Sequence, residues 1–163
     1  MRIILSLLIA LLLSGCVSTS KSNKLPQVVN DYFDIYSKRD DFNKFMTYYA
    51  DNAQFKDIIY GNSFNNKVEI RSFLDWGKGE FKILNGTRAL TVTKHTFGER
   101  TAITEGFFHT FSYDGQKLGP WLFVITQEFN PSNKIIQQTD WINYTPRDNF
   151  LGGKNMNDEI VKK

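Results

Sequence analysis

An aspartate at the end of an alternating segment is the first side chain in this sequence with a setting suited to chemistry. Ala53, Phe55 and Asp57 fall on one face of an extended strand, with Gln54 and Lys56 on the other. Because the first face is apolar, folding would carry the Asp57 carboxylate into a nonpolar interior. A desolvated carboxylate is suited to accept and return a proton near neutrality. The alternative is an aspartate at the mouth of the strand that is solvated or caps a turn.

Two further acid–base side chains lie on later strand-like segments. Asp140 alternates with Ile136, Gln138 and Ile142. In residues 101–113 the more apolar face predicts an inward His109, and this face comprises Ile103, Glu105, Phe107, His109, Phe111 and Tyr113. A histidine near two carboxylates would serve as an acid–base group at neutral pH. The alternative is a histidine hydrogen-bonded across the sheet or on its outer face.

Helical segments surround the Asp57 strand. Pro26 suits the first turn of a helix over 25–38, which carries a broad apolar face. Apolar residues at 42, 45, 46 and 49 have helical spacing, and Asp51-Asn52 is typical of a turn before the strand. Asn66 and Glu69 have the spacing of a capping box, which predicts a third helix to about Trp76. That helix is expected to bury Val68, Ile70, Phe73 and Leu74 and to end at Gly77.

The second half of the chain is β-like. Residues 81–94, 101–113, 121–129 and 135–144 are rich in Thr, Val, Ile and aromatic residues, with turn residues between them. Short connections favour an antiparallel meander. The expected fold is α+β, with three N-terminal helices packed on one face of a strongly curved antiparallel sheet, a cone-shaped roll.

The N-terminal residues predict where in the cell the protein is located. Arg2 precedes an apolar segment, 3–13, that would reach roughly 16 Å as a helix, against about 30 Å of membrane hydrocarbon. A signal peptide over 1–15 is therefore favoured over a membrane span. Leu13-Ser14-Gly15-Cys16 resembles the bacterial lipobox, so we expect lipidation at Cys16 and anchoring to the bilayer. With Ser18 two residues after the cysteine, the pattern resembles that of lipoproteins sorted to the outer membrane of Gram-negative cells.

The rest of the chain divides into a polar tether at 16–24, one folded domain at 25–146 and a polar tail at 147–163. Loss of Arg2 with the signal peptide lowers the net charge from +3 to +2, too little to indicate a nucleic-acid partner. The sequence lacks HExxH, CxxC, GxSxG, P-loop and GxGxxG motifs. We therefore expect no metal, nucleotide or nicotinamide cofactor.

The order of these elements resembles the SnoaL-like and nuclear-transport-factor-2-like superfamily, which includes ketosteroid isomerase and polyketide cyclases. The resemblance covers about residues 25–144. Residues 42–57 are similar to the family stretch that ends in Ala-Asp-Asp-Ala, Phe and Asp, and 66–74 are similar to its following helix. The resemblance implies a ligand pocket in the mouth of a cone, and a homodimer through the sheet.

The resemblance also implies roles for particular side chains. Asp57 falls where ketosteroid isomerase has its general base, although Ile58 replaces the proline common after it. Tyr32 falls at the oxyanion-hole tyrosine. Gln127 stands where that enzyme has a protonated aspartic acid as second donor, which argues against steroid isomerase activity. Asp140 is on the face that lines the pocket in relatives.

Aromatic residues are numerous, 15% of the chain, and would line such a pocket or simply fill the core. The residues expected to contact a small hydrophobic ligand are Tyr36, Trp76, Phe107, Phe111, Trp121, Phe123 and Trp141. The favoured interpretation is a lipid-anchored envelope protein that binds such a ligand or a partner. The alternatives are a cofactor-independent isomerase, cyclase or dehydratase-like enzyme, using Asp57 with His109 or Asp140, and a purely structural lipoprotein.

Overall fold

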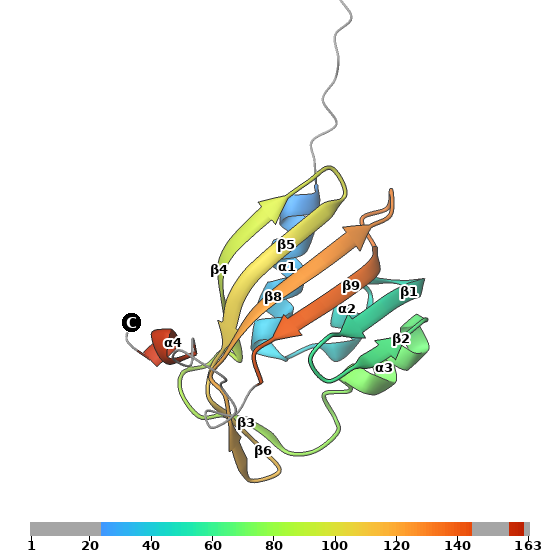
Figure 1. Ribbon diagram of the computed structural model, residues 1–163. Helices are drawn as coiled ribbons and strands as arrows, with labels where there is room; N and C mark the ends of the chain where they lie inside the picture. Colours follow the sequence, from blue (N-terminus) through green and yellow to red (C-terminus); the bar gives the residue numbers. More distant parts are fainter. Residues whose placement is uncertain (1–23, 145–156, 162–163) are drawn as a thin grey trace, which may run out of the picture.

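The computed structural model describes residues 24–144 and 157–161 (Figure 1). The predicted signal peptide, Cys16, nearly all of the tether and residues 145–156 lie outside the described residues. None of the helices within the described ranges is long and apolar enough to cross a membrane.

The first half of the folded part contains three helices, as expected, and two strands lie between the second and the third. The helices are α1 (Leu25–Lys38), α2 (Phe42–Met46) and α3 (Lys67–Leu74), and a short α4 (Asp158–Val161) ends the described chain. Asp41 caps α2 by accepting a hydrogen bond from Lys44 N, and Asn66 caps α3 by accepting one from Glu69 N. In α3 only Ile70 is fully buried, and Val68 and Phe73 are 77% and 37% exposed, so the prediction that these two side chains are buried was wrong.

The main sheet has six strands in the order β2-β1-β9-β8-β5-β4. Its members are β1 (Tyr49–Asp57), β2 (Asn62–Phe64), β4 (Leu90–Phe97), β5 (Thr101–Phe108), β8 (Trp121–Phe129) and β9 (Ile135–Ile142). A second sheet has the order β3-β6-β7, from β3 (Phe81–Ile83), β6 (Phe111–Tyr113) and β7 (Gln116–Leu118). The α+β class is confirmed. The β1–β9 pair is parallel, however, so the main sheet is mixed.

Two sequence predictions within these strands were wrong. Asp51-Asn52 is not a turn before β1 but lies inside it, where the pairing with β9 shifts register between Tyr49 and Gln54. The extra residues form a bulge, which turn-favouring side chains also suit. The run 81–94 splits into β3 and β4, and these belong to different sheets.

The inward face of β5 is the opposite of the one predicted. Ala102, Thr104 and Gly106 are buried. A Cβ on Gly106 would lie only 2.6 Å from the Phe123 ring and 2.3 Å from the carbonyl oxygen of Thr91, so a glycine is required there. Small side chains face inward because aromatic rings from neighbouring elements fill the space.

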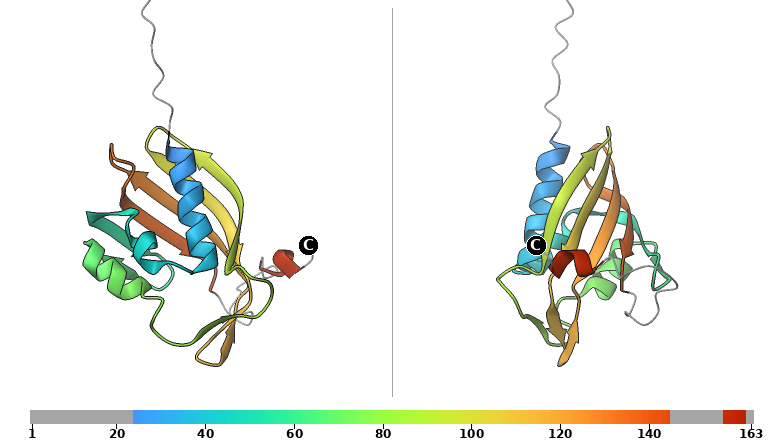
Figure 2. Two further views of the ribbon diagram at one scale, coloured as in Figure 1. Left: turned by 180° about the vertical axis from the view of Figure 1, so that it is seen from behind. Right: turned by 60° about the vertical axis from the view of Figure 1, so that its left-hand side comes forward.

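Helices α1 and α2 cover one face of the main sheet, and α3 packs beside β1 (Figure 2). The core between the layers is rich in aromatic side chains, among them Tyr32, Phe45 and Phe55. The C-terminal end of α1 and the small sheet meet at one end of the molecule (Figure 1). The N-terminal end of α1 lies at the other.

Candidate functional site

A cavity of about 170 Å³ lies where α1 ends, β8 begins and β9 ends, and we call it the mouth cavity. Its lining is mostly aromatic. The ten lining residues are Tyr36, Arg39, Phe81, Ala89, Phe108, Phe111, Tyr113, Trp121, Ile142 and Tyr144. Tyr36, Phe111 and Trp121 were among the predicted ligand contacts, so the structure brings these three together around one cavity.

Asp57 ends β1 and is 3% exposed. Its Oδ1 accepts hydrogen bonds from the backbone N–H groups of Ile59 and Tyr60, both at 3.0 Å. Its Oδ2 accepts one from the hydroxyl of Tyr144, also at 3.0 Å, and Tyr144 lines the mouth cavity. The carboxylate is thus buried, as predicted, and also stabilises the turn after β1. The Tyr144 hydroxyl thus links Asp57, which does not itself line the cavity, to a residue that does.

Asp140 is the direct neighbour of Asp57 across the parallel β1–β9 pair. The two side chains lie on the same side of the sheet, and both are 3% exposed. Burial raises the pKa of Asp140 from 3.8 to about 7; the hydrogen bond from Gln138 opposes this rise, and the nearby Asp57 charge adds to it. Near neutral pH Asp140 therefore still holds its proton in part of the molecules, directly beside Asp57.

Tyr32 and Gln127, the expected oxyanion donors, belong to a buried hydrogen-bond network. The Tyr32 hydroxyl lies 2.8 Å from that of Tyr49, and each tyrosine donates to Gln138 Oε1, at 3.0 and 2.9 Å. Gln127 Nε2 donates to the same oxygen at 3.0 Å. Gln138 Nε2 in turn donates to Asp140 Oδ1 at 2.9 Å. Neither Tyr32 nor Gln127 lines the mouth cavity. Their hydroxyl and amide groups form hydrogen bonds within the core instead.

His109 lies apart from both aspartates. It follows β5, where its Nε2 forms a 2.8 Å hydrogen bond with the Thr91 hydroxyl and its ring packs edge-on against Phe107 at 5.0 Å. The expectation that His109 points inward was wrong, because the alternation of β5 is reversed. His95 is partly buried against Phe33 and hydrogen-bonds to Thr104. Among the described residues, no group of three or more His, Cys, Asp or Glu could hold a metal ion.

The other predicted ligand contacts are divided among three locations. Trp76 stacks on Tyr36 at 6.2 Å, just behind the cavity wall. Phe123 is buried in the core against Phe33 and Phe108. Phe107 lies on the outer face of β5, and Trp141, 48% exposed, lies on the outer face of β9. Trp141 cannot share a face with Asp140, because adjacent residues of a strand point to opposite sides.

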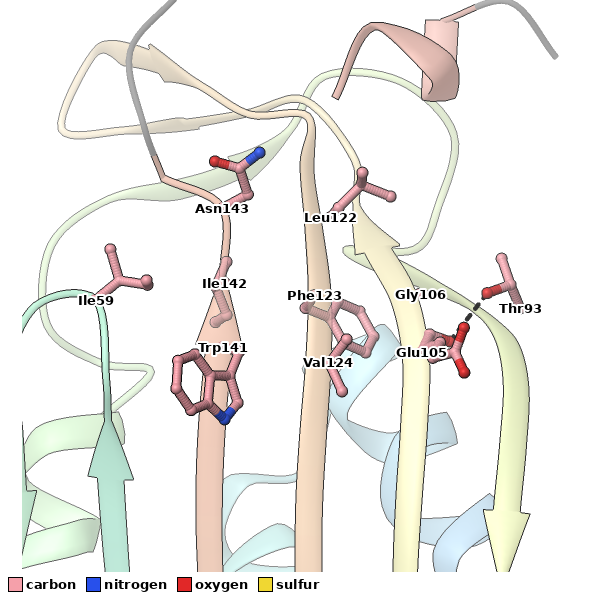
Figure 3. Close-up of a pocket in the computed structure, with 10 residues that line it drawn as sticks. All are labelled: Ile59, Thr93, Glu105, Gly106, Leu122, Phe123, Val124, Trp141, Ile142 and Asn143. Atoms are coloured by element: carbon pink, nitrogen blue, oxygen red, sulfur yellow. Dashed lines mark hydrogen bonds between the residues drawn. The ribbon is translucent and has the colours of Figure 1, made fainter. Parts of the chain in front are cut away.

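Trp141 instead borders a shallow groove of about 430 Å³ on the sheet face away from the helices (Figure 3). We call this surface the outer face. Ile59, Val124 and Trp141 are exposed there, and Thr93 and Glu105 are joined by a hydrogen bond at its edge. An exposed apolar surface of this kind indicates an interaction site.

Sequence reasoning missed Arg39 and Tyr144. Arg39 stands between Lys38 and Asp40 and resembles an ordinary solvated charge in the sequence. Tyr144 is the last tyrosine after a predicted strand, and nothing in the sequence links it to Asp57. Both residues lie just beyond the end of an element. Sequence periodicity does not predict the direction of a side chain there.

No protein-family model matches the sequence, and no curated protein matches it. Solved structures do resemble it. An NTF2-like protein of unknown function from Burkholderia xenovorans is 18% identical, with a TM-score of 0.55, over 81% of this chain and 96% of that one. A protein from Shewanella putrefaciens described as a SnoaL-like polyketide cyclase is 15% identical, with a TM-score of 0.60, over 86% and 98%.

A third structure, from Kribbella flavida and described as a ketosteroid isomerase, is 14% identical, with a TM-score of 0.56, over 81% of this chain and 90% of that one. At these identities the likeness establishes the fold. The chain therefore has the NTF2-like fold found in SnoaL-like and ketosteroid isomerase-like proteins. Because one fold hosts both enzymes and binding proteins, the activity has to be argued from the site.

Proposed function

We propose that this protein is a lipid-anchored cell-envelope protein whose mouth cavity binds a small hydrophobic ligand. The observation that carries the proposal is the cavity itself, an apolar space of about 170 Å³ that contains a few polar groups. Pockets for drug-sized ligands measure about 300–1,000 Å³, so this cavity suits a smaller molecule. The lipobox-like Leu13-Ser14-Gly15-Cys16 supports the anchor.

The hydrogen bonds of the site favour binding over catalysis. The Tyr32 hydroxyl is shared between Tyr49 and Gln138, so it has no free position toward the cavity. All three described donors to Asp57 come from the chain itself. An oxyanion hole needs donors that point at the reacting oxygen, and these groups are already used within the fold.

The position of the cavity suits a ligand from the aqueous compartment. The tether would join α1 at Leu25, whereas Tyr36 and Arg39, which line the cavity, lie at the other end of that helix. Fourteen residues of helix separate these ends by about 20 Å. A chain anchored through its N-terminus would therefore carry the cavity away from the point of attachment.

Acetophenone, a small neutral aromatic ketone, tests ligand binding. We expect it to change the fluorescence of Trp121, and Trp121→Phe should remove most of the change whereas Trp141→Phe, on the outer face, should not. Ala89→Leu, which adds volume at the buried cavity wall, should weaken binding at least about tenfold. Equal binding to the wild type and to Ala89→Leu would contradict the proposal.

A second candidate function is proton transfer, and the pairing of Asp57 with Asp140 favours it. A buried carboxyl group whose pKa is raised to about 7, beside a second carboxyl group, is suited to exchange a proton near neutrality. The same ligand tests it: a proton-transfer enzyme should exchange the methyl hydrogens of acetophenone in D₂O, followed by proton NMR. Exchange at the rate of buffer alone would rule out this chemistry for that ketone, and exchange unchanged in Asp57→Asn would rule out Asp57 as its base.

We also propose that the outer face binds a second copy of the chain. Val124 is 39% exposed and Trp141 48%, on neighbouring strands β8 and β9, where they are cross-strand partners. In a homodimer these side chains would be removed from water. Trp141→Glu should shift the protein to monomer in sedimentation velocity, and a monomeric wild type at high concentration would contradict the proposal.

A further inference from the structure

Arg39 has a backbone conformation that favours glycine. It ends α1 with φ 54° and ψ 37°, and its N–H donates to the carbonyl oxygen of Ile35 at 2.8 Å. Glycine is the usual residue in this left-handed cap, because a Cβ is disfavoured there. The free-energy cost of this conformation for an arginine points to a use for its side chain.

The guanidinium of Arg39 contacts aromatic rings rather than an acidic side chain of the described residues. It lies 4.1 Å from the centre of the Phe81 ring and 4.9 Å from that of Trp76. Burial lowers the pKa of Arg39, and no carboxylate within the described ranges pairs with it. Arg88, by contrast, is paired with Asp34 at 2.8 Å. Ring contacts supply no hydrogen-bond acceptor for the five N–H donors of a guanidinium.

Arg39 is also the sole charged side chain among the ten residues that line the mouth cavity. The Tyr36 hydroxyl forms no hydrogen bond within the described part of the chain. Burial, with a smaller contribution from the Asp140 charge, raises the pKa of Tyr36, so this hydroxyl stays protonated and can donate. The remaining walls are chiefly Phe108, Phe111 and Trp121.

We propose that the mouth cavity takes a small monocarboxylate with an apolar body, and that Arg39 binds the carboxylate. A guanidinium presents paired N–H groups that match the two oxygens of a carboxylate. The apolar body then packs against the aromatic walls. This inference rests on the proposed ligand-binding function and adds the charge of the ligand to it.

The test compares two probes that differ in charge but hardly in shape, phenylacetate and phenylacetamide. Both are titrated into the full chain in one non-ionic detergent, with calorimetry for the dissociation constants and NMR for the side-chain Nε–H of Arg39. We expect phenylacetate to bind at least about tenfold more tightly, as a charge-assisted hydrogen bond predicts. It should also shift the Arg39 Nε–H signal.

Variants then assign the preference to Arg39. Arg39→Gln should reduce the ratio of the two dissociation constants to about one, and Arg39→Lys should keep part of it. Arg71→Gln is the matched control, because Arg71 also lies over an aromatic ring, Phe42 at 4.8 Å, but donates to Asn43 on the surface. It should keep the full preference.

Three results would overturn the inference. If both probes bind equally to the wild type, the cavity binds ligands but does not select charge, and the proposed binding function stands. If Arg39→Gln keeps the preference, another cation is responsible. If neither these probes nor acetophenone binds, the proposed binding function fails as well. The comparison of probes on the wild type needs no variant, so an unstable Arg39→Gln would not prevent a decision.

Discussion

Replacement of Asp140 by Asn is expected to stabilise the protein at alkaline pH but not in acid. Asp140 is buried beside Asp57, and burial raises its pKa from 3.8 to about 7. Between these two values the folded protein holds a proton that the unfolded chain releases. The contribution of this group to stability is therefore fully present below pH 3.8 and is lost as the pH rises through about 7.

The magnitude follows from the interval between the two pKa values. Each pH unit corresponds to about 1.36 kcal/mol, so the interval from 3.8 to about 7 amounts to about 4 kcal/mol. A domain of this size has a free energy of unfolding of about 5–15 kcal/mol, so the loss is a large fraction of the total. Asn has the shape of the protonated acid and keeps the oxygen that accepts from Gln138 Nε2. It should therefore stabilise the protein by about 2–4 kcal/mol at pH 8.

Urea unfolding of the wild type and of Asp140→Asn at several pH values from 4 to 8 measures this difference. Other titrating groups cancel when one curve is subtracted from the other. Glu128→Gln, which removes an exposed carboxylate on β8, is the matched control and should leave the pH dependence unchanged. If the Asp140→Asn and wild-type curves are parallel from pH 4 to 8, Asp140 does not hold a proton in the folded protein and the electrostatic argument is refuted.

Three other perturbations test separate parts of the structure. Cys16→Ala should move the protein from the detergent phase to the aqueous phase in detergent partitioning, and unchanged partitioning would contradict lipidation. Asp57→Ala should lower the free energy of unfolding by about 1–3 kcal/mol in urea, because two backbone N–H groups and the Tyr144 hydroxyl lose their acceptor; Asp57→Asn should cost less, and no loss in either would contradict this role. Gln127→Leu should raise the melting temperature slightly, because Gln127 Oε1 is buried without a partner among the described residues, while Gln138 Oε1 keeps two other donors; a marked fall would contradict that account.

The sequence predicted the elements whose patterns are local. Helix α1 has the predicted bounds, 25–38, because its apolar face and Pro26 act within a few turns of one chain segment. Asn66 caps α3 as predicted for the same reason. The burial of Asp57 and Asp140 also followed from alternation along one strand.

The alternation of polar and apolar residues predicted the wrong inward face where side-chain size, rather than polarity, determined which side chains point inward. On β5 the predicted inward face was the more apolar one, but Gly106 and its small neighbours lie inside because rings from α1 and β8 occupy that space. His109 therefore lies beside Thr91 instead of Asp140. Strand β2 and the small sheet were not predicted, since a three-residue strand is too short to show a clear alternation of polar and apolar residues.

The sequence by itself determined the α+β class, the helices and the two inward aspartates, because periodicity and capping depend on neighbours along the chain. Only the tertiary structure decided which groups meet. The parallel β1–β9 pair places Asp57 beside Asp140, and the left-handed end of α1 places Arg39 at a cavity lined by residues from six other elements or their ends. These contacts join residues up to about a hundred positions apart, and their geometry depends on packing that no local pattern encodes.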